Sequence, residues 1–414
     1  MFTETIELRG HIIDTQTLPR VLDQIVALGA DYRIEKIEIG HTRKDPSRAL
    51  VSVSARDDAA LQAVIELIAR SGATPVNKVD VALERAPRDG VLPDDFYATT
   101  NLPTEILLGG RWVRVENAEM DCAVVVNLNT SRDRKGAGMA ARCVRMHRVC
   151  KGEWVVTGHA GVRVEAPSRA PDAEKDAFGF MGSAVSSEKP KHLLIREIAR
   201  HIRAEKKQGK KILFVGGPAI VHTGAGPHLE KLIRDGYVDI LFAGNALAAH
   251  DIESALFGTS LGVSLESGAP VEHGHEHHLR TINRVRAAGS IAAAVKKGII
   301  PTGIMRACVL KRVPFVLSGS IRDDGPLPDV IVDMPKAQDA MRALLPNVGL
   351  ALMVGTTLLS IATGNMLPAS VRTICVDINP AVVTKLADRG TFHAIGLVTD
   401  AELFLRTLAK ELSR

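Results

Sequence analysis

Apolar and polar residues alternate in a recognisable order over the N-terminal part of the chain. Strand-like and helix-like periodicities follow one another there. The expected elements are a strand at 4–13, a helix at 17–28, strands at 32–39 and 49–54, a helix at 57–69 and a last strand at 78–83. The order βαββαβ predicts a ferredoxin-like α+β domain at 1–86. That fold alone assigns no chemistry, because such modules serve ligand binding, dimerisation and scaffolding alike.

The pattern changes between residues 87 and 190, where the apolar runs are short. Ile106 to Val115 is typical of a hairpin with Gly109-Gly110 at its turn. Pro, Ser and Gly are frequent at 166–190, which indicates a loop or linker. We therefore expect 87–190 to form a small β-rich domain and a linker.

From residue 191 to 414 strand-like and helix-like segments alternate. The expected strands are 211–215, 240–243, 315–317, 330–331, 349–354, 373–377 and 394–398. Such alternation predicts an α/β domain with a Rossmann-like, mostly parallel sheet. Ligands of these sheets sit beyond the carboxyl ends of the strands, and most of the unusual polar clusters of this region follow a strand end.

Composition narrows the class of protein. The chain has 414 residues, a net charge of only +5 and 4% aromatic residues, which disfavours a nucleic-acid binder. Five cysteines without a CxxC pair indicate a reducing compartment. The N-terminus does not read as a signal sequence and no uncharged apolar segment approaches membrane-spanning length, so we expect a cytoplasmic protein without a membrane partner.

The strand at 373–377 ends in an acidic residue, Asp377, before Asn379. A carboxylate at the tip of a parallel strand can accept hydrogen bonds from the two hydroxyls of a nucleotide ribose. The Gly-x-Gly-x-x-Gly loop that usually accompanies it is absent, and Gly355-Thr356-Thr357 stands upstream instead. Either a nucleotide binds with a variant geometry, or Asp377 only terminates the strand.

Two segments with small residues follow earlier strands. Gly216 to Pro227 contains four glycines before a helix, which favours an anion or cofactor role over a loop that needs glycine only for its turns. Asn245 and Ala246 follow the next strand, where small residues let a flat ring lie against the main chain. Asn245 can bond an amide or a ribose, or simply cap a helix.

Two charged segments complete the candidates. Glu272 to His278 holds four histidines and two glutamates, which favours an active-site rim or a solvated loop over a metal site. Ser318 to Asp329 follows a strand directly; there Arg322 can clamp a carboxylate, and Asp323 or Asp324 can hold or deprotonate an amine. The alternative is an Arg-Asp pair that stabilises a Pro/Gly loop.

With these residues in view, the chain resembles the archaeal-type NAD-dependent ornithine cyclodeaminases. The same unit forms the C-terminal part of cyanobacterial arginine dihydrolase/ornithine cyclodeaminases and carries the label LOR/SDH bifunctional enzyme conserved region. The resemblance is most specific at 242–246, 271–279, 317–329 and 373–383. It implies a nucleotide domain of the deoxyhypusine-synthase or sirtuin kind, which explains Asp377 without the glycine fingerprint.

The family resemblance also implies a reaction. L-Ornithine would become L-proline and ammonia by redox-neutral hydride transfer to and from bound NAD, in a site that needs a carboxylate clamp and an acid/base group. We predict Arg322 as the clamp, Asp323 as the amine partner and His275 or His277 as the proton shuttle. The predicted cofactor contacts are Asn245, Ala246, Ser320, Gly355, Thr356, Thr357, Asp377, Asn379, Thr399 and Asp400.

Two other functions stay open at this point. One is a net NAD(P)-dependent amino-acid oxidoreductase of the saccharopine or proline type, which would release reduced cofactor. The other is a nonenzymatic amino-acid and NAD sensor. Under each reading we expect a small-molecule partner and, from the general habit of such proteins, a homo-oligomer.

Overall fold

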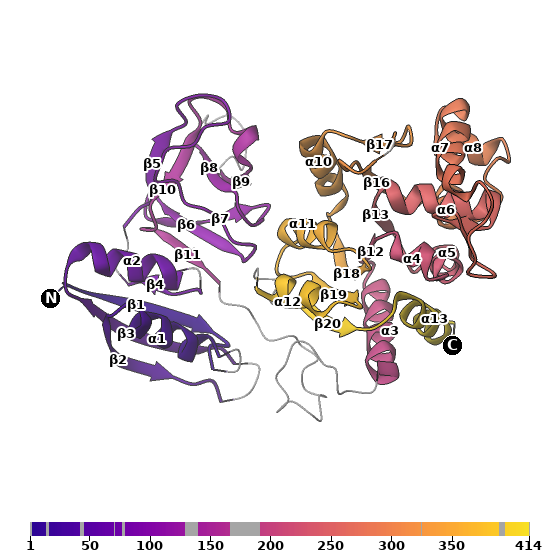
Figure 1. Ribbon diagram of the computed structural model, residues 1–414. Coiled ribbons are helices and arrows are strands. Elements are labelled where there is room, and N and C mark those ends of the chain that lie inside the picture. Colours follow the sequence, from indigo (N-terminus) through magenta and orange to yellow (C-terminus); the bar gives the residue numbers. More distant parts are fainter. Residues whose placement is uncertain are drawn as a thin grey trace. The chain divides into compact units, whose positions relative to one another are not determined.

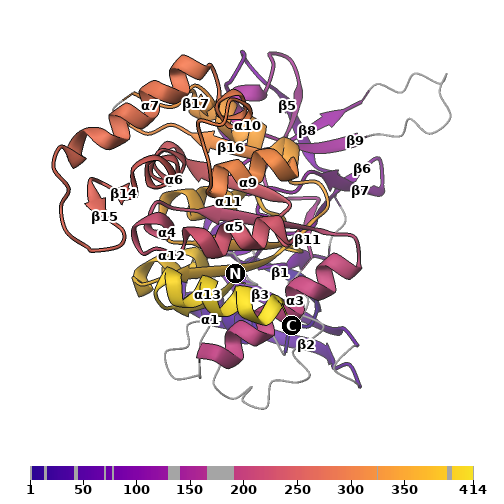
Figure 2. The ribbon, with the colours of Figure 1, turned by 90° about the vertical axis from the view of Figure 1, so that its right-hand side faces the viewer.

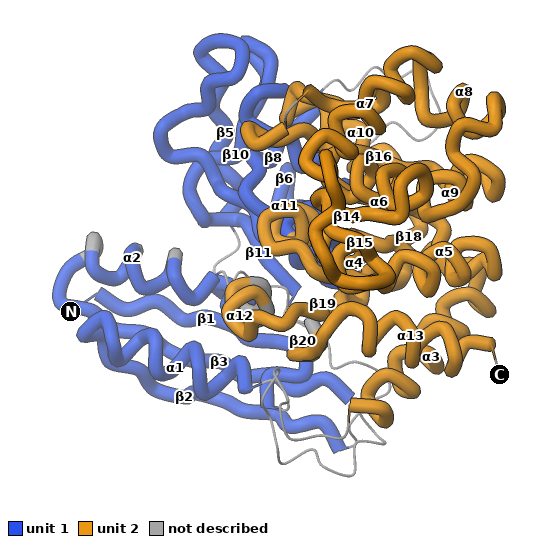
Figure 3. Tube along the Cα trace, turned by 45° about the vertical axis from the view of Figure 1, so that its right-hand side comes forward, with its two compact units in different colours: residues 1–181, 365–369 blue, residues 182–364, 370–414 orange. Residues whose placement is uncertain are grey.

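The computed structural model describes residues 2–13, 16–41, 45–69, 71–76, 79–128, 140–165, 191–323, 325–388 and 394–413, which Figure 1 follows along the chain. They form two compact units. Unit 1 comprises residues 1–181 with 365–369, and unit 2 comprises 182–364 with 370–414 (Figure 3). Each unit is built around its own sheets and cores, so each is described by itself.

Unit 1 begins with a ferredoxin-like sandwich, as the sequence predicts. Its elements are β1 (Phe2–Gly10), α1 (Thr17–Ala27), β2 (Asp31–Glu38), β3 (Ser47–Ala55), α2 (Asp58–Ala69) and β4 (Thr74–Pro75). The sheet has the order β2-β3-β1-β4 with antiparallel neighbours. Val51 and Val53 of β3 are fully buried and pack with Ile25 of α1 and Ile65 of α2. The alternation of apolar and polar residues along these strands therefore corresponds to side chains that point alternately into the core and toward the open face of the sheet.

The last strand of this sandwich lies earlier than the sequence predicts. The prediction at 78–83 is wrong, because Thr74–Pro75 pairs with β1 and the next strand, β5 (Ala82–Arg85), pairs with β10 in another sheet. The carboxylate of Asp80 accepts N–H bonds from Gly109 and Gly110 at 2.7 and 3.0 Å. These hydrogen bonds hold the segment around Asp80 to the second sheet. The pattern of apolar residues in the segment does not predict them.

The second sheet of unit 1 is β-rich and has seven strands in the order β11-β6-β7-β9-β8-β10-β5. Besides β5 they are β6 (Thr104–Leu108), β7 (Arg111–Glu116), β8 (Ala123–Asn127), β9 (Ala140–Val144), β10 (Trp154–Thr157) and β11 (Val162–Val164), with a 3-10 turn at Met146–Arg148. The predicted hairpin is confirmed, because β6 and β7 pair antiparallel and Gly109 and Gly110 have φ of 59° and 72°. The predicted linker at 166–190 lies outside the described residues.

Unit 2 contains the predicted parallel sheet, in the order β17-β16-β13-β12-β18-β19-β20. The strands are β12 (Lys211–Gly216), β13 (Ile240–Gly244), β16 (Phe315–Ser318), β17 (Val330–Ile331), β18 (Val348–Val354), β19 (Arg372–Asp377) and β20 (Ala394–Val398). All neighbours are parallel. Every residue of β18 is buried, as expected for a strand with both faces covered.

Helices and short elements surround this sheet. They are α3 (Lys191–Lys207), α4 (Ala219–His222), α5 (Gly226–Arg234), α6 (Asn245–Phe257), β14 (Thr259–Ser260), β15 (Val263–Ser264), a 3-10 turn (Gly274–Glu276), α7 (His277–Ala288), α8 (Ile291–Lys296), α9 (Ile304–Lys311), α10 (Met334–Leu344), α11 (Leu358–Met366), α12 (Pro380–Asp388) and α13 (Ala401–Leu412). Figure 2 shows α3 and α13 side by side. Phe214, Phe242 and Phe404 are among the largest fully buried side chains of the core. No described helix is long and apolar enough to cross a bilayer.

The strand order reverses direction at the centre of the sheet. From β12 the chain moves outward through β13, β16 and β17, whereas from β18 it moves the other way through β19 and β20. A doubly wound sheet binds its ligands at this switch point, beyond the carboxyl ends of the two central strands. There the loops touch: a Cβ on Gly217 would lie 1.9 Å from the carbonyl oxygen of Gly355.

We expect the Gly217→Ala variant to be less stable than the parent by about 1–3 kcal/mol, because the added methyl group must push two main-chain segments apart. Chemical denaturation followed by circular dichroism measures this loss. Gly226→Ala is the matched control, since a Cβ at that position meets nothing within 4 Å. Equal stability of the two variants would contradict the close approach.

Candidate functional site

One half of the carboxyl edge is formed by β18, β19 and β20. Gly355 follows β18 with φ of 62°, and α11 begins at Leu358. Asp377 ends β19 about twenty residues later, which is the spacing between the turn and the ribose-binding acid in dinucleotide folds. The N–H of Thr399 donates to the carbonyl oxygen of Asp377 at 3.1 Å. The structure therefore brings these predicted cofactor residues to one edge of the sheet.

Several of these side chains also hold the ends of helices. Asp377 Oδ1 accepts the N–H of Asn379 at 2.9 Å, and Asn379 Oδ1 accepts the N–H of Ala381 at 3.0 Å. Asp400 Oδ1 accepts the first N–H groups of α13 and is its N-cap. By contrast, the buried hydroxyl of Thr399 has no hydrogen-bond partner among the described residues. A buried polar atom of this kind needs a partner, which a ligand at this edge can supply.

The other half of the edge is formed by the ends of β13 and β16. Asn245 is buried at the start of α6, and its Oδ1 accepts the N–H of Leu327 at 3.0 Å. The turn after β16 is held by its own hydrogen bonds. Asp323 Oδ2 accepts the main-chain N–H of Ser320 at 2.8 Å, and the Ser320 hydroxyl accepts the main-chain N–H of Arg322 at 3.2 Å. Arg322 is exposed on this turn, and Asp324 lies outside the described residues. The predicted residues of this loop thus lie together, anchored by Asn245.

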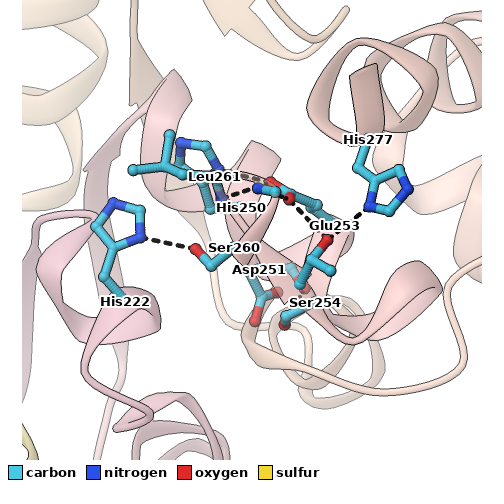
Figure 4. Close-up of polar contacts among 10 residues, drawn as sticks. His222, His250, Asp251, Glu253, Ser254, Ser260, Leu261 and His277 are labelled. Atoms are coloured by element: carbon cyan, nitrogen blue, oxygen red, sulfur yellow. Dashed lines mark hydrogen bonds and ion pairs between the residues drawn. The ribbon is translucent and has the colours of Figure 1, made fainter. Parts of the chain in front are cut away.

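A buried carboxylate with two histidines lies on and around α6 (Figure 4). Glu253 is fully buried and accepts hydrogen bonds from the hydroxyl of Thr259 at 2.9 Å and the N–H of Gly262 at 3.1 Å. Its other oxygen lies 2.8 Å from His250 Nδ1. The Thr259 hydroxyl in turn lies 2.9 Å from His277 Nδ1. The chain Glu253, Thr259, His277 therefore links α6 to the start of α7.

Glu253 is held in its ionised form. Burial by itself would raise the pKa of this carboxyl, but the hydrogen bonds from His250, Gly262 and Thr259 outweigh burial and hold the pKa below its ordinary value. An ionised carboxylate only accepts hydrogen bonds. All groups around Glu253 must therefore direct protons toward it.

This requirement fixes the tautomers of two histidines. His250 must carry its proton on Nδ1, because that nitrogen faces the Glu253 carboxylate. Thr259 gives its single hydroxyl proton to Glu253, so the Nδ1 of His277 must donate to the Thr259 oxygen. Neutral His250 and His277 consequently present an unprotonated Nε2. The His277 ring is further oriented by stacking on Phe257, with centroids 4.4 Å apart.

His222 completes this cluster from α4. Its Nδ1 lies 2.7 Å from the Ser260 hydroxyl, and its ring lies 4.9 Å from that of His250. Burial lowers the pKa of His222, and the neighbouring His250 lowers it further, while Glu253 acts in the opposite direction. The surroundings of His222 therefore favour its neutral form, which can accept a proton.

Sequence reasoning did not single out His222, His250 or Glu253 as site residues. The available signal was a histidine and a glutamate three residues apart inside a helix rich in apolar residues, where a buried charged residue requires a partner. It also left His275 and His277 equivalent. The structure separates them, because the His275 side chain is 80% exposed beside Glu276 and is not hydrogen-bonded to the Glu253 network in the described chain. Among the described residues, no three His, Cys, Asp or Glu side chains are placed so that they could hold a metal ion.

Three family models match the chain. The model described as arginine dihydrolase ArgZ-like, C-terminal, Rossmann fold matches residues 196–408, and its companion first region matches 103–195. The LOR/SDH bifunctional enzyme conserved region matches residues 3–102. Together they account for both units of the fold.

Named relatives agree with these family models. An ornithine cyclodeaminase of Methanothermobacter thermautotrophicus is 50% identical over 100% of this chain and 98% of its own length. The bifunctional arginine dihydrolase/ornithine cyclodeaminase AgrE of a Nostoc species is 42% identical over 99% of this chain, which spans only 58% of AgrE.

Solved structures share the fold. The apo structure of cyanobacterial ArgZ matches with a TM-score of 0.84 and 38% identity, covering 100% of this chain and 58% of ArgZ. The ternary complex of AgrE with ornithine and NAD⁺ matches with a TM-score of 0.53 and 40% identity, covering 100% of this chain and 57% of that chain. The predicted Rossmann-like α/β fold is thereby confirmed.

We expect Glu253→Gln to reverse the tautomer of His250, because the amide NH₂ of glutamine would donate to Nδ1 where the carboxylate accepted. Nitrogen-15 correlation spectra of histidine-labelled protein distinguish the two tautomers. The same variant should lose about 1–3 kcal/mol of stability, since a buried carboxylate with several donors is replaced by an amide that cannot satisfy all of them. A proton on Nε2 of neutral His277 in the parent would refute the assignment.

Proposed function

The chain belongs to the ornithine cyclodeaminase family related to the C-terminal part of arginine dihydrolase ArgZ, and we propose that it converts L-ornithine to L-proline and ammonia with NAD as its cofactor. The observation that carries this proposal is the β18–α11–β19 unit beside the switch point, with Asp377 at its end. Full-length relatives of the chain are named ornithine cyclodeaminase, and AgrE is known in complex with ornithine and NAD⁺. The arginine dihydrolase activity of the longer relatives is not part of the proposal.

The carboxyl edge of the sheet fits a dinucleotide. Gly355, Thr356 and Thr357 precede α11, whose first N–H groups suit a pyrophosphate. Asp377 and Asn379 would hold the adenosine ribose, and the Thr399 hydroxyl, for which the described chain supplies no hydrogen-bond partner, lies at the same edge. Further proposed contacts are Asn245, Ala246, Ser320 and Asp400. When bound, NAD would supply a hydride acceptor that returns the hydride to the product, so the proposed reaction would involve no net oxidation.

The substrate groups are assigned to the loop after β16 and to α7. Arg322 would clamp the ornithine carboxylate through its planar guanidinium. One carboxylate oxygen of Asp323 accepts the Ser320 N–H, so the other oxygen can hold a substrate amine. Arg286 of α7 donates to the carbonyl oxygen of Pro326 at 3.0 Å, which ties this loop to the helix that begins with His277.

A base is needed for the substrate amine before hydride can leave the adjacent carbon. The unprotonated Nε2 of His277 meets this need, and its orientation is fixed by Thr259 and Glu253. His275 has no such support in the described chain. We therefore assign the proton transfer to His277 in preference to His275.

Incubation of the protein with L-ornithine and a small amount of NAD⁺ should yield proline and ammonia in equal amounts over many turnovers. The reason is that hydride returns to the product, so cofactor is not consumed. Amino-acid analysis and an ammonia assay measure the two products together. NADH that accumulates in proportion to ornithine would instead identify a net oxidoreductase, and absence of turnover with every basic amino acid would support a sensor.

The Asp377→Ala variant should bind NAD about 10–100-fold more weakly, because hydrogen bonds to an ionised carboxylate contribute roughly 1.5–3 kcal/mol. Calorimetric titration with NAD⁺ measures the change. Asp333→Ala is the matched control: the Asp333 side chain also accepts a main-chain N–H a few residues further on, that of Lys336 at 3.1 Å, but it follows β17, which four strands separate from β19 in the sheet order. Unchanged affinity of the Asp377 variant would reduce this residue to a strand terminator.

A further inference from the structure

In the part of the chain that the structure describes, the outer strand of the ferredoxin-like sheet, β2, has no strand on its outer edge. It pairs with β3 and stands last in the sheet order, and all eight of its residues, Asp31–Glu38, are exposed. It contains no proline, which is a common device against edge pairing. Such an edge is a template for another strand.

A bulge places the apolar side chains of β2 on one face. Tyr32 and Ile34 lie opposite Val53 and Val51 of β3, and after a register shift Ile37 lies opposite Ala49. These three β3 residues all point into the core. Because the bulge inserts Glu35, Ile34 and Ile37 share a face although an odd number of positions separates them. The exposed fractions of Tyr32, Ile34, Ile37 and Ile39 are 40%, 40%, 42% and 62%.

The order of apolar and charged residues in 32–39 is the same when it is read forward or backward from the Glu35–Lys36 bond. When the segment is laid antiparallel on itself, the opposed pairs are Tyr32 with Ile39, Arg33 with Glu38, Ile34 with Ile37, and Glu35 with Lys36. Every apolar residue meets an apolar one, and every charge meets its opposite. Cross-strand pairs of these kinds stabilise an antiparallel ladder, whereas like charges oppose it.

We propose that β2 pairs antiparallel with β2 of a second copy of the chain, about a two-fold axis at the Glu35–Lys36 bond, and so joins two four-stranded sheets into one. Directly opposed residues of an antiparallel pair lie on the same face of the sheet. In a regular strand, residues mirrored about a peptide bond lie on opposite faces. The extra residue of the bulge reverses the alternation of faces between Ile34 and Ile37, so the residues that are paired in this dimer lie on the same face. The bulge therefore sets the register of the pairing and does not block the edge.

The competing register about Ile34 fails this test. It would oppose Arg33 and Glu35 favourably, but it would also place Tyr32 opposite Lys36. Tyr32 lies on the face of Val53, whereas Lys36 lies opposite Leu50, on the other face. The two could not face each other in a continuous ladder.

The energy of the contact comes mainly from the main chain and the apolar face. Within one copy, Arg33 Nε lies 3.8 Å from Glu35 Oε1, and Lys36 Nζ lies 2.6 Å from Glu38 Oε1. Dimer formation therefore replaces ion pairs within a strand by ion pairs between strands, and the net gain from such exposed pairs is small. The charges therefore select the partner and the register. Val26 and Leu28, just before β2 in the chain, are two further exposed apolar residues, with exposed fractions of 59% and 48%.

The test uses two charge reversals in the full-length chain. Arg33→Glu places a new carboxylate opposite the Glu38 of the other copy, and Glu38→Arg places a new guanidinium opposite the Arg33 of the other copy. By the two-fold symmetry each repulsive contact occurs twice in a dimer. Each variant alone should therefore dimerise about tenfold or more weakly than the parent in sedimentation equilibrium, because two attractive pairs become repulsive.

A one-to-one mixture of the two variants removes the repulsion. The new carboxylate at position 33 of one variant meets the new guanidinium at position 38 of the other. The second contact of the same mixed dimer joins the unchanged Glu38 of the first variant to the unchanged Arg33 of the second. The mixture should therefore associate as strongly as the parent, which also shows that both variants are folded.

Further variants separate this contact from other contacts. Arg56→Glu reverses an 88%-exposed charge outside β2 and should leave the dissociation constant unchanged. The double reversal Arg33→Glu with Glu35→Arg would restore opposite charges only in the register about Ile34. Its dimerisation should therefore remain weaker than that of the parent. A monomeric parent, a single reversal without effect, or a mixture no stronger than its components would each overturn the proposal.

Discussion

The close approach of two loops above the centre of the parallel sheet is the constraint on which unit 2 depends. β12 and β18 are neighbours, yet they lead the chain in opposite directions, so their loops must separate beyond the strand ends. They diverge from the point where Gly217 meets the main chain of Gly355. Any side chain at Gly217 would displace the loops that lead to α4 and α11. The geometry of the switch point therefore depends on a glycine, although the familiar glycine fingerprint is absent.

A second constraint is the burial of Glu253. A buried carboxylate is destabilising unless donors surround it, and here a hydroxyl, main-chain N–H groups and His250 do so. The donors come from α6, from β14 and from the turn that follows β14, so the network joins three consecutive segments of the chain. His277 is bound to the outer end of this network. The position of its proton is consequently determined by Glu253 on another helix, through Thr259, which explains how one histidine of the polar segment 272–278 is oriented.

The sequence revealed those features that depend on local pattern. The ferredoxin-like order, the Gly109-Gly110 hairpin and the parallel sheet were predictable because alternation and turn residues act over a few positions. The fourth strand of the sandwich was not, because the side chain of Asp80 bonds to a distant hairpin. Nor was the cluster of His222, His250 and Glu253, whose members come together only when α4, α6 and β14 pack. Asp377 could be recognised at a strand end, but its spacing from Gly355 became meaningful only when β18 and β19 proved adjacent.

Capping and ligand binding are compatible roles for the polar residues at the strand ends. Asp377 accepts the Asn379 N–H on Oδ1 in the turn before α12, and a carboxylate has about four lone-pair sites, so this bond leaves acceptors for a ribose. Asn245 accepts with its carbonyl oxygen, which leaves its NH₂ group able to donate. A side chain already held by one structural bond loses less conformational entropy when it binds a ligand. The choice between strand terminator and ligand contact is thus not exclusive, since the structural bond pre-organises the group for binding.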